Sequence, residues 1–361
     1  MSSNNLARLP VTVVTGFLGA GKSTLLRQLL LHSGLRLAVL VNEFGEVGID
    51  GDLIRSCGFC PEEEAESRVV ELANGCLCCT VQDEFLPTMQ TLLQRADQLD
   101  GIVVETSGLA LPLPLVQAFQ WPEIRTKTRV TGIVTVVDGE ALSAGSVVGD
   151  PAALQAQQQS DPSLDHLADL DDLFHDQLQA ADLVLVSRGD LLDDNQLAAV
   201  RRRLLDGLRP GVEVLPMQRG AIPAALLFGL DREAEHHDHD QHDHEHGHEG
   251  HHHDHDHHDH THVAMQSASI CLSGSFDRSS LELALRQQIE QQSLLRLKGR
   301  AWFAGKPHPL QIQAVGPRLE CWFDTHTPAT ARPPEPGLEV VALGLSLDEP
   351  AFHRALQAML G

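Results

Sequence analysis

Eight residues near the N-terminus have the types and spacing that bind phosphate. The segment from Gly16 to Ser23 reads GFLGAGKS and matches the pattern G-x-x-x-x-G-K-[ST], between a strand-like run and a helix-like segment. We expect backbone N–H groups to wrap the phosphates at a helix N-terminus, with Lys22 at the β and γ oxygens and the Ser23 hydroxyl on Mg²⁺. The predicted nucleotide contacts here come from Gly16, Gly19, Ala20, Gly21, Lys22, Ser23 and Thr24.

Two further segments place acids and glycines at the same predicted sheet edge. An apolar strand ends in Glu105, which is predicted to hold the Mg²⁺ shell or a water, while Gly108 lets the backbone approach the γ-phosphate. The loop from residue 42 to residue 50 contains three acids and two glycines, which is typical of a mobile switch. Glu43 or Asp50 could fix Mg²⁺ or the attacking water, and the sequence does not choose between them. The predicted catalytic residues are Lys22, Glu43 and Glu105.

Base recognition is predicted where another strand ends. The apolar run at 183–186 leads into Ser187, Arg188, a glycine and Asp190, at the place where GTPases usually carry N-K-x-D. Asp190 keeps the carboxylate that accepts hydrogen bonds from guanine. Ser187 and Arg188 depart from the pattern, which would lower guanine affinity, yet GTP remains preferred to ATP.

Three thiols close together indicate a metal site. Cys76, Cys78 and Cys79 follow a strand-like run, and thiolates at this spacing suit a tetrahedral ion such as Zn²⁺ or Co²⁺ with a fourth position open. Cys57 and Cys60 form a separate C-x-x-C, which is either an auxiliary ligand pair or an exposed loop with two unremarkable thiols. Two more cysteines, Cys271 and Cys321, stand in apolar, strand-like surroundings and are predicted to lie in a core.

A histidine-rich tract interrupts the chain. Residues 236–262 contain fifteen His and eight Asp or Glu, a composition that cannot bury a core and predicts a disordered linker. Imidazoles interleaved with carboxylates chelate divalent metals without fixed geometry. The tract is therefore either a metal reservoir or a solubilising spacer.

The elements around these motifs alternate between two periodicities. Buried strands are predicted at 11–15, 37–41, 69–72, 102–105, 130–137 and 183–186, and helices at 23–31, 84–95 and 196–205. This alternation of strands and helices, together with the phosphate-binding motif, predicts an α/β P-loop NTPase domain with a mostly parallel sheet over residues 8–228. A linker follows at 229–263, and a small α+β domain at 264–361 has predicted strands at 269–272, near Trp302 and near Cys321, and a helix at 279–291. The region 150–172 is expected to be a surface excursion.

Charge and hydropathy exclude some partners. The chain has 26 basic and 50 acidic side chains, a formal charge of -24 that repels nucleic acid and anionic lipid alike. No signal peptide and no run of about 20 apolar residues is present, so we expect a soluble, cytoplasmic protein with no membrane partner. Seven cysteines without a secretory signal favour reduced thiols over disulfides.

Taken in order, these motifs resemble those of a known family. The P-loop, EFGE at 43–46, GCLCC at 75–79, ETSG at 105–108 and the histidine tract are similar to the CobW family of GTPases linked to metal delivery. The similarity covers nearly the whole chain, and RLKGRAW at 296–302 looks like the C-terminal domain of that family. Other runs, such as WPEIR at 121–125, are most similar to its cobalamin-linked members. The resemblance implies that Co²⁺ is loaded at the three-cysteine site in the Mg-GTP state and released on hydrolysis to an acceptor such as a cobaltochelatase.

Other functions remain open from the sequence. Zinc delivery is the alternative within the family, because Zn²⁺ generally outcompetes Co²⁺ for such ligands. A metal-storage protein whose metal binding is independent of the nucleotide is a different class. The hydrogenase and urease nickel-insertion proteins share the P-loop but lack the GCxCC element, so they rank low.

Overall fold

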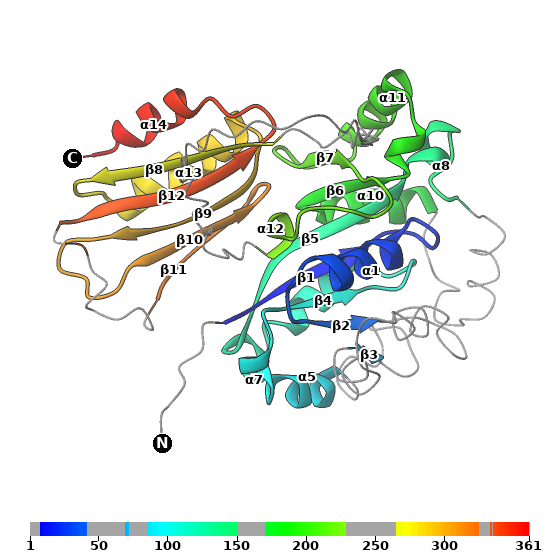
Figure 1. Ribbon diagram of the computed structural model, residues 1–361, viewed down its shortest axis with the longest axis horizontal. Coiled ribbons are helices and arrows are strands. Elements are labelled where there is room, and N and C mark those ends of the chain that lie inside the picture. Colours follow the sequence, from blue (N-terminus) through cyan, green and yellow to red (C-terminus); the bar gives the residue numbers. More distant parts are fainter. Residues whose placement is uncertain are drawn as a thin grey trace, which may run out of the picture.

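The computed structural model describes residues 8–41, 85–149, 170–228, 265–324, 333 and 335–360, together with the backbone of 69–71 (Figure 1). Its strands form two separate sheets, one in an N-terminal domain and one in a C-terminal domain. None of the helices in these ranges is long and apolar enough to cross a membrane.

The N-terminal sheet has seven strands in the order β3-β2-β4-β1-β5-β6-β7, and every pair is parallel. The central strands are continuous apolar runs, as expected for strands that are covered on both faces. Their bounds are β1 Leu9–Thr15, β2 Leu37–Val41, β3 Val69–Glu71, β4 Gly101–Glu105, β5 Thr128–Asp138, β6 Leu183–Ser187 and β7 Glu213–Pro216.

Helices cover both faces of this sheet. On one face α1 (Lys22–His32) and α12 (Ala224–Phe228) bury leucines in a core with β1, β2 and β6. The other face carries α5 (Leu86–Leu93), α6 (Pro112–Ala118) and α7 (Pro122–Arg125), and beyond them α8 (Gly139–Ser143), α10 (Leu170–Ala180) and α11 (Asp194–Leu205). The chain leaves β1 toward β2 on one side and later returns to β5 on the other, so β1 lies at a topological switch point, where ligands bind in such folds.

The C-terminal domain is an antiparallel sheet with helices on one face (Figure 1). Its strand order is β11-β10-β9-β12-β8, and α13 (Arg278–Gln291) and α14 (Glu349–Gln357) pack on a core of alternating apolar residues. The strands are β8 Gln266–Ser273, β9 Leu294–Trp302, β10 Leu310–Val315, β11 Arg318–Phe323 and β12 Gly337–Gly344.

Apolar contacts join the two domains. Leu295 and Val315 of the C-terminal sheet belong to the same buried cluster as α1 and α12 of the N-terminal domain. Gly132 on β5 leaves room for Val315, whose Cγ1 lies 3.2 Å from where a Cβ on that glycine would stand. The β10–β11 turn also packs on the N-terminal domain, because a Cβ on Gly316 would meet the carbonyl oxygen of Asp182 at 2.1 Å. The domains therefore share an ordered interface.

The predicted elements agree with the structure where their apolar runs are strong. The six predicted strands of the N-terminal sheet and the helices at 23–31, 84–95 and 196–205 are confirmed within a few residues at each end, except that the described part of the third strand ends at Glu71. Strands β7, β10 and β12 and helices α6, α7, α8, α10, α12 and α14 were not predicted. Within the predicted excursion, α10 already begins at Leu170, and residues 150–169 lie outside the described part of the chain, as does the tract at 236–262. The predicted bounds of the two domains and of the linker between them stay predictions.

Candidate functional site

The loop between β1 and α1 has the backbone that a phosphate cradle requires. Gly16 has φ of 136° and Gly21, the residue before α1, has φ of 100°, both in the region that favours glycine. A Cβ on Gly16 would meet the carbonyl oxygen of Val136 at 2.1 Å. Only glycine fits at that position, and it holds the loop against the end of β5.

Lys22 points back into this loop rather than into solvent. Its ammonium donates to the carbonyl oxygens of Gly16 at 2.9 Å and Phe17 at 3.2 Å, and its side chain is 6% exposed. The Glu105 carboxylate lies 3.7 Å away. A cation and a carboxylate therefore meet at the mouth of the loop, which suits phosphate neutralisation beside a metal-bound or water-binding acid.

The segment after β4 is locked against the phosphate loop. Glu105 stands opposite Val14 in the parallel register, and the Thr106 hydroxyl donates to the Thr15 hydroxyl at 2.9 Å. A Cβ on Gly108 would come within 2.6 Å of the Leu18 backbone nitrogen. The structure thus brings together the predicted residues of these two segments, and their individual roles stay predictions.

The predicted base-recognition residues follow β6 next to the same loop. A Cβ on Gly21 would lie 3.1 Å from the Cβ of Ser187. Arg188 has φ of 54°, and its guanidinium forms an ion pair with the buried Asp138 carboxylate. Asp190 lies in a short 3-10 turn and is exposed to solvent, so its carboxylate is accessible to a ligand.

Two features of this edge were not predicted. Asp138 ends β5, caps α8 through the Ala141 N–H and holds Arg188, whose Nε also lies 3.5 Å from Glu140. The segment after β7 packs on the start of α1, since a Cβ on Gly220 would lie 2.8 Å from the Thr24 Cγ2. The ion pair between Asp138 and Arg188 joins residues 50 positions apart and leaves no periodic signal in a sequence. Gly220, a glycine in a turn, could have indicated the close approach of this segment to α1.

Several predicted ligands lie outside the described residues. These are Glu43, Asp50, Cys57, Cys60, Cys76, Cys78 and Cys79. Within the described ranges, no group of three or more His, Cys, Asp or Glu is placed to hold a metal ion. The three-cysteine metal site therefore stays a prediction.

The core assignment is wrong for Cys271, whereas Cys321 is partly buried against the apolar core of the C-terminal domain. Cys271 is exposed because β8 alternates, burying Ala268, Ile270 and Leu272 on the opposite face. Cys321 is half-buried, and burial raises the pKa of its thiol to about 12. Neither cysteine belongs to the predicted three-cysteine site.

Comparison with known proteins decides the family. The model of the CobW/HypB/UreG nucleotide-binding domain matches residues 10–216, which span every strand of the N-terminal sheet. The chain belongs to the CobW/HypB/UreG family. A second model, that of the cobalamin synthesis protein cobW C-terminal domain, matches residues 265–360. As a member of this family, the chain is a GTPase.

Curated relatives in this family extend over the whole chain. A protein of Pseudomonas aeruginosa named zinc chaperone CobW is 47% identical over 358 residues, covering 98% of this chain and 92% of that protein. One of Sinorhizobium sp with the same name is 41% identical over 359 residues, covering 99% and 98%. The zinc chaperone YjiA of Escherichia coli is 26% identical over 315 residues, covering 85% and 86%.

Proposed function

We propose that this CobW-family GTPase binds Zn²⁺ in its GTP-bound state and releases it to an acceptor protein after hydrolysis. The support for zinc, rather than for the cobalt that the resemblance implied, is that relatives 47% and 41% identical along nearly the whole chain are both named zinc chaperones. Cobalt delivery for cobalamin synthesis has no corresponding support among them.

The nucleotide half of the proposal rests on the geometry around Lys22. Lys22 and the loop from Gly16 to Gly21 would hold the phosphates, with Asp190 at the guanine base. Glu105 fits Mg²⁺, since its carboxylate offers oxygen ligands next to the Lys22 charge, and Ser23, the residue after Lys22, would offer its hydroxyl. When bound, Mg²⁺ would neutralise charge on the β and γ oxygens. Glu43 or Glu105 would then position the attacking water.

The single observation that carries the coupling is the register of three neighbouring strands. Val41, at the end of β2, stands opposite both Glu71 on β3 and Glu105 on β4. The predicted switch starts directly after Val41, and Cys76 follows Glu71 by only five residues. Both segments therefore begin at the edge that carries Glu105, and this shared edge supports an influence of the γ-phosphate on the thiol site.

Cobalt serves as a spectroscopic probe for this zinc site. Thiolate-to-Co²⁺ charge transfer reports sulfur ligation, so the full chain would be titrated with Co²⁺ in the presence of Mg²⁺ and either a non-hydrolysable GTP analogue or GDP, and then competed with Zn²⁺. We expect metal affinity to be about five- to 150-fold higher with the analogue, the usual scale of coupling between two sites. Zn²⁺ should displace the cobalt.

Two variants make the result specific. Cys78→Ala should abolish the charge-transfer band, while Cys271→Ala, an exposed thiol in the C-terminal domain, should leave it unchanged. Equal metal affinity in the analogue and GDP states would overturn the gated mechanism and favour nucleotide-independent storage. Failure of Zn²⁺ to displace Co²⁺ at equal concentration would overturn the choice of zinc.

A further inference from the structure

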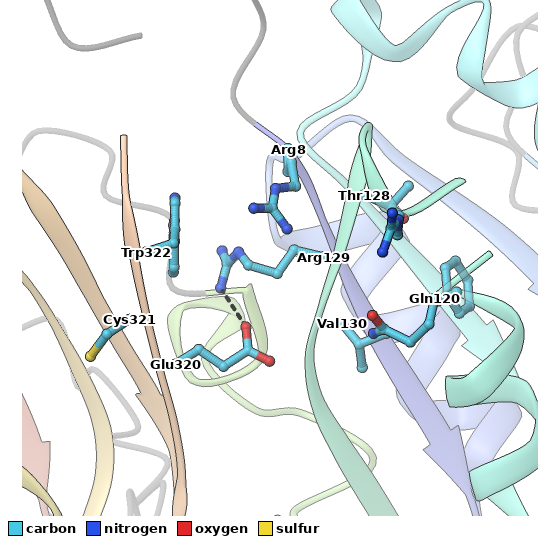
Figure 2. Close-up of a pocket in the computed structure, with 10 residues that line it drawn as sticks. Arg8, Gln120, Thr128, Arg129, Val130, Glu320, Cys321 and Trp322 are labelled. Carbon is cyan, nitrogen blue, oxygen red and sulfur yellow. Dashed lines mark ion pairs between the residues drawn. The ribbon is translucent and has the colours of Figure 1, made fainter. Parts of the chain in front are cut away.

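A cavity of about 300 Å³ lies between the two domains, at the sheet edge opposite the phosphate loop. The beginnings of β1 and β5 and the end of α7 form one wall, and β11 of the C-terminal domain forms the other. Figure 2 shows Arg8 and Arg129 on the N-terminal side, facing Glu320 and Trp322. This cavity belongs to neither the nucleotide site nor the predicted thiol site.

The charge in this cavity is unbalanced. Arg8, Arg125 and Arg129 line it, whereas Glu320 is the one acid among its lining residues. In a protein with a formal charge of -24, three arginines against one carboxylate mark a local positive centre. Such a centre attracts an anion that the rest of the surface would repel.

Arg129 is a buried cation in this cavity whose pairing with protein acceptors is incomplete. Its side chain is only 9% exposed, and its guanidinium stacks over the Trp322 ring at 4.4 Å from the ring centroid. Glu320 approaches one terminal nitrogen at 3.7 Å, which is longer than a good hydrogen bond, and the buried Nε has no hydrogen-bond partner among the described residues. An incompletely paired, buried guanidinium is destabilising, so an acceptor that reaches its terminal nitrogens from the cavity would be favourable.

The neighbouring charge adds to this effect. The pKa of Arg129 is lowered to about 10, mainly because of burial; the charge of Glu320 opposes the shift and that of Arg8 contributes to it. Two guanidinium groups that line one cavity and repel each other offer paired N–H donors of the kind that bind a carboxylate or phosphate group.

We propose that this cavity is a binding site for a small oxyanion, an inorganic phosphate or a short carboxylate, held between Arg8 and Arg129. Its volume is at the lower end for ligand pockets and is ample for an anion of this size. Glu320 and Trp322 come from the other domain, so one wall of the cavity is present only when the domains are docked. Glu320 competes with the anion for Arg129.

Isothermal titration of the full chain with inorganic phosphate, and separately with malonate, tests the proposal. The nucleotide site is first saturated with Mg²⁺ and a non-hydrolysable GTP analogue, so that phosphate cannot report on the phosphate loop. We expect saturable binding of at least one probe. Arg8→Gln should weaken it by roughly tenfold, since one charge-assisted donor is lost. Glu320→Gln should strengthen it, because a competing carboxylate is removed.

Two controls separate this site from general charge effects. Arg202→Gln removes an exposed arginine on α11 and should leave both affinities unchanged. Trp322→Phe keeps an aromatic ring beneath Arg129 and should keep the binding. Absence of saturable binding for both probes, or equal affinity in Arg8→Gln and the unaltered chain, would show that Arg129 is only an interdomain contact.

Discussion

Arg318 on β11 forms an ion pair with Asp182, a carboxylate that is completely buried in the N-terminal domain. Asp182 also accepts from Arg209 at 2.7 Å and from the backbone N–H of Ile133 at 2.9 Å. One side chain thus fixes the start of β6, the neighbouring strand β5 and the C-terminal domain. This pair lies at the sheet edge opposite the nucleotide.

Asp182→Asn should therefore destabilise the protein strongly. Removing one partner of a buried ion pair lowers the free energy of unfolding by about 3–5 kcal/mol, because Arg209 and Arg318 lose their counter-charge. Arg300→Ala is the matched control, since its pair with Glu339 is about half exposed and such surface pairs contribute at most about 1 kcal/mol. Urea unfolding of both variants measures the difference. Similar midpoints in the two would show that Asp182 is dispensable.

Lys22→Ala should lower the turnover of GTP by at least about a hundredfold while the fold is retained. The ammonium neutralises phosphate charge, and its contacts are to carbonyl oxygens of its own loop and to Glu105, not to the core. Phosphate release and circular dichroism measure the two effects. Lys127→Ala, an exposed lysine between α7 and β5, serves as the control. Unaltered turnover in Lys22→Ala would reject the phosphate-loop assignment.

Gly108→Ala should weaken GTP binding with only moderate loss of stability. The added Cβ would press on the Leu18 backbone nitrogen at 2.6 Å and displace the phosphate loop, and overpacking of this kind typically costs about 1–3 kcal/mol. Gly344→Ala is the control, because its Cβ would meet nothing closer than 3.5 Å. Fluorescent nucleotide titration compares them. The close approach of the two loops would be irrelevant to binding if both variants kept the affinity of the unaltered chain.

Deleting residues 236–262 should lower the number of weakly bound metal ions and leave one tight, nucleotide-dependent site. The tract offers fifteen imidazoles without fixed geometry, whereas the tight site is assigned to the thiols. Metal analysis after dialysis, with the GTP analogue and with GDP, measures both classes of ion. Loss of the tight site with the deletion would make the tract a primary source of ligands.

Much of the N-terminal fold could be predicted from the sequence because its strands are unusually clear. The predicted run at 37–41 coincides with β2 Leu37–Val41, since a strand buried on both faces is a continuous apolar run. The edge strand β7 is four residues long and ends in a proline, which weakens the same signal. The five-residue helix α12 depends on packing against β1 and β5 rather than on local periodicity.

The residues of the candidate site also fall into two groups, those that the sequence could predict and those that it could not. Gly16, Lys22 and Glu105 belong to local motifs whose residue types carry their chemistry, so spacing was enough to predict that they meet. Asp138 with Arg188, and Arg129 with Trp322, are joined only by the packing of distant strands. A single sequence contains no period or spacing that relates the members of such pairs.

The strand order of the N-terminal sheet has a consequence for how the protein is made. β1 emerges first from the ribosome, yet its two partners are β4 and β5, which begin at Gly101 and Thr128. At about 5–20 residues per second, the first apolar strand waits several seconds for either neighbour. Its exposed edges must meanwhile avoid pairing with other chains, so chaperone assistance during synthesis should favour yield of the folded GTPase.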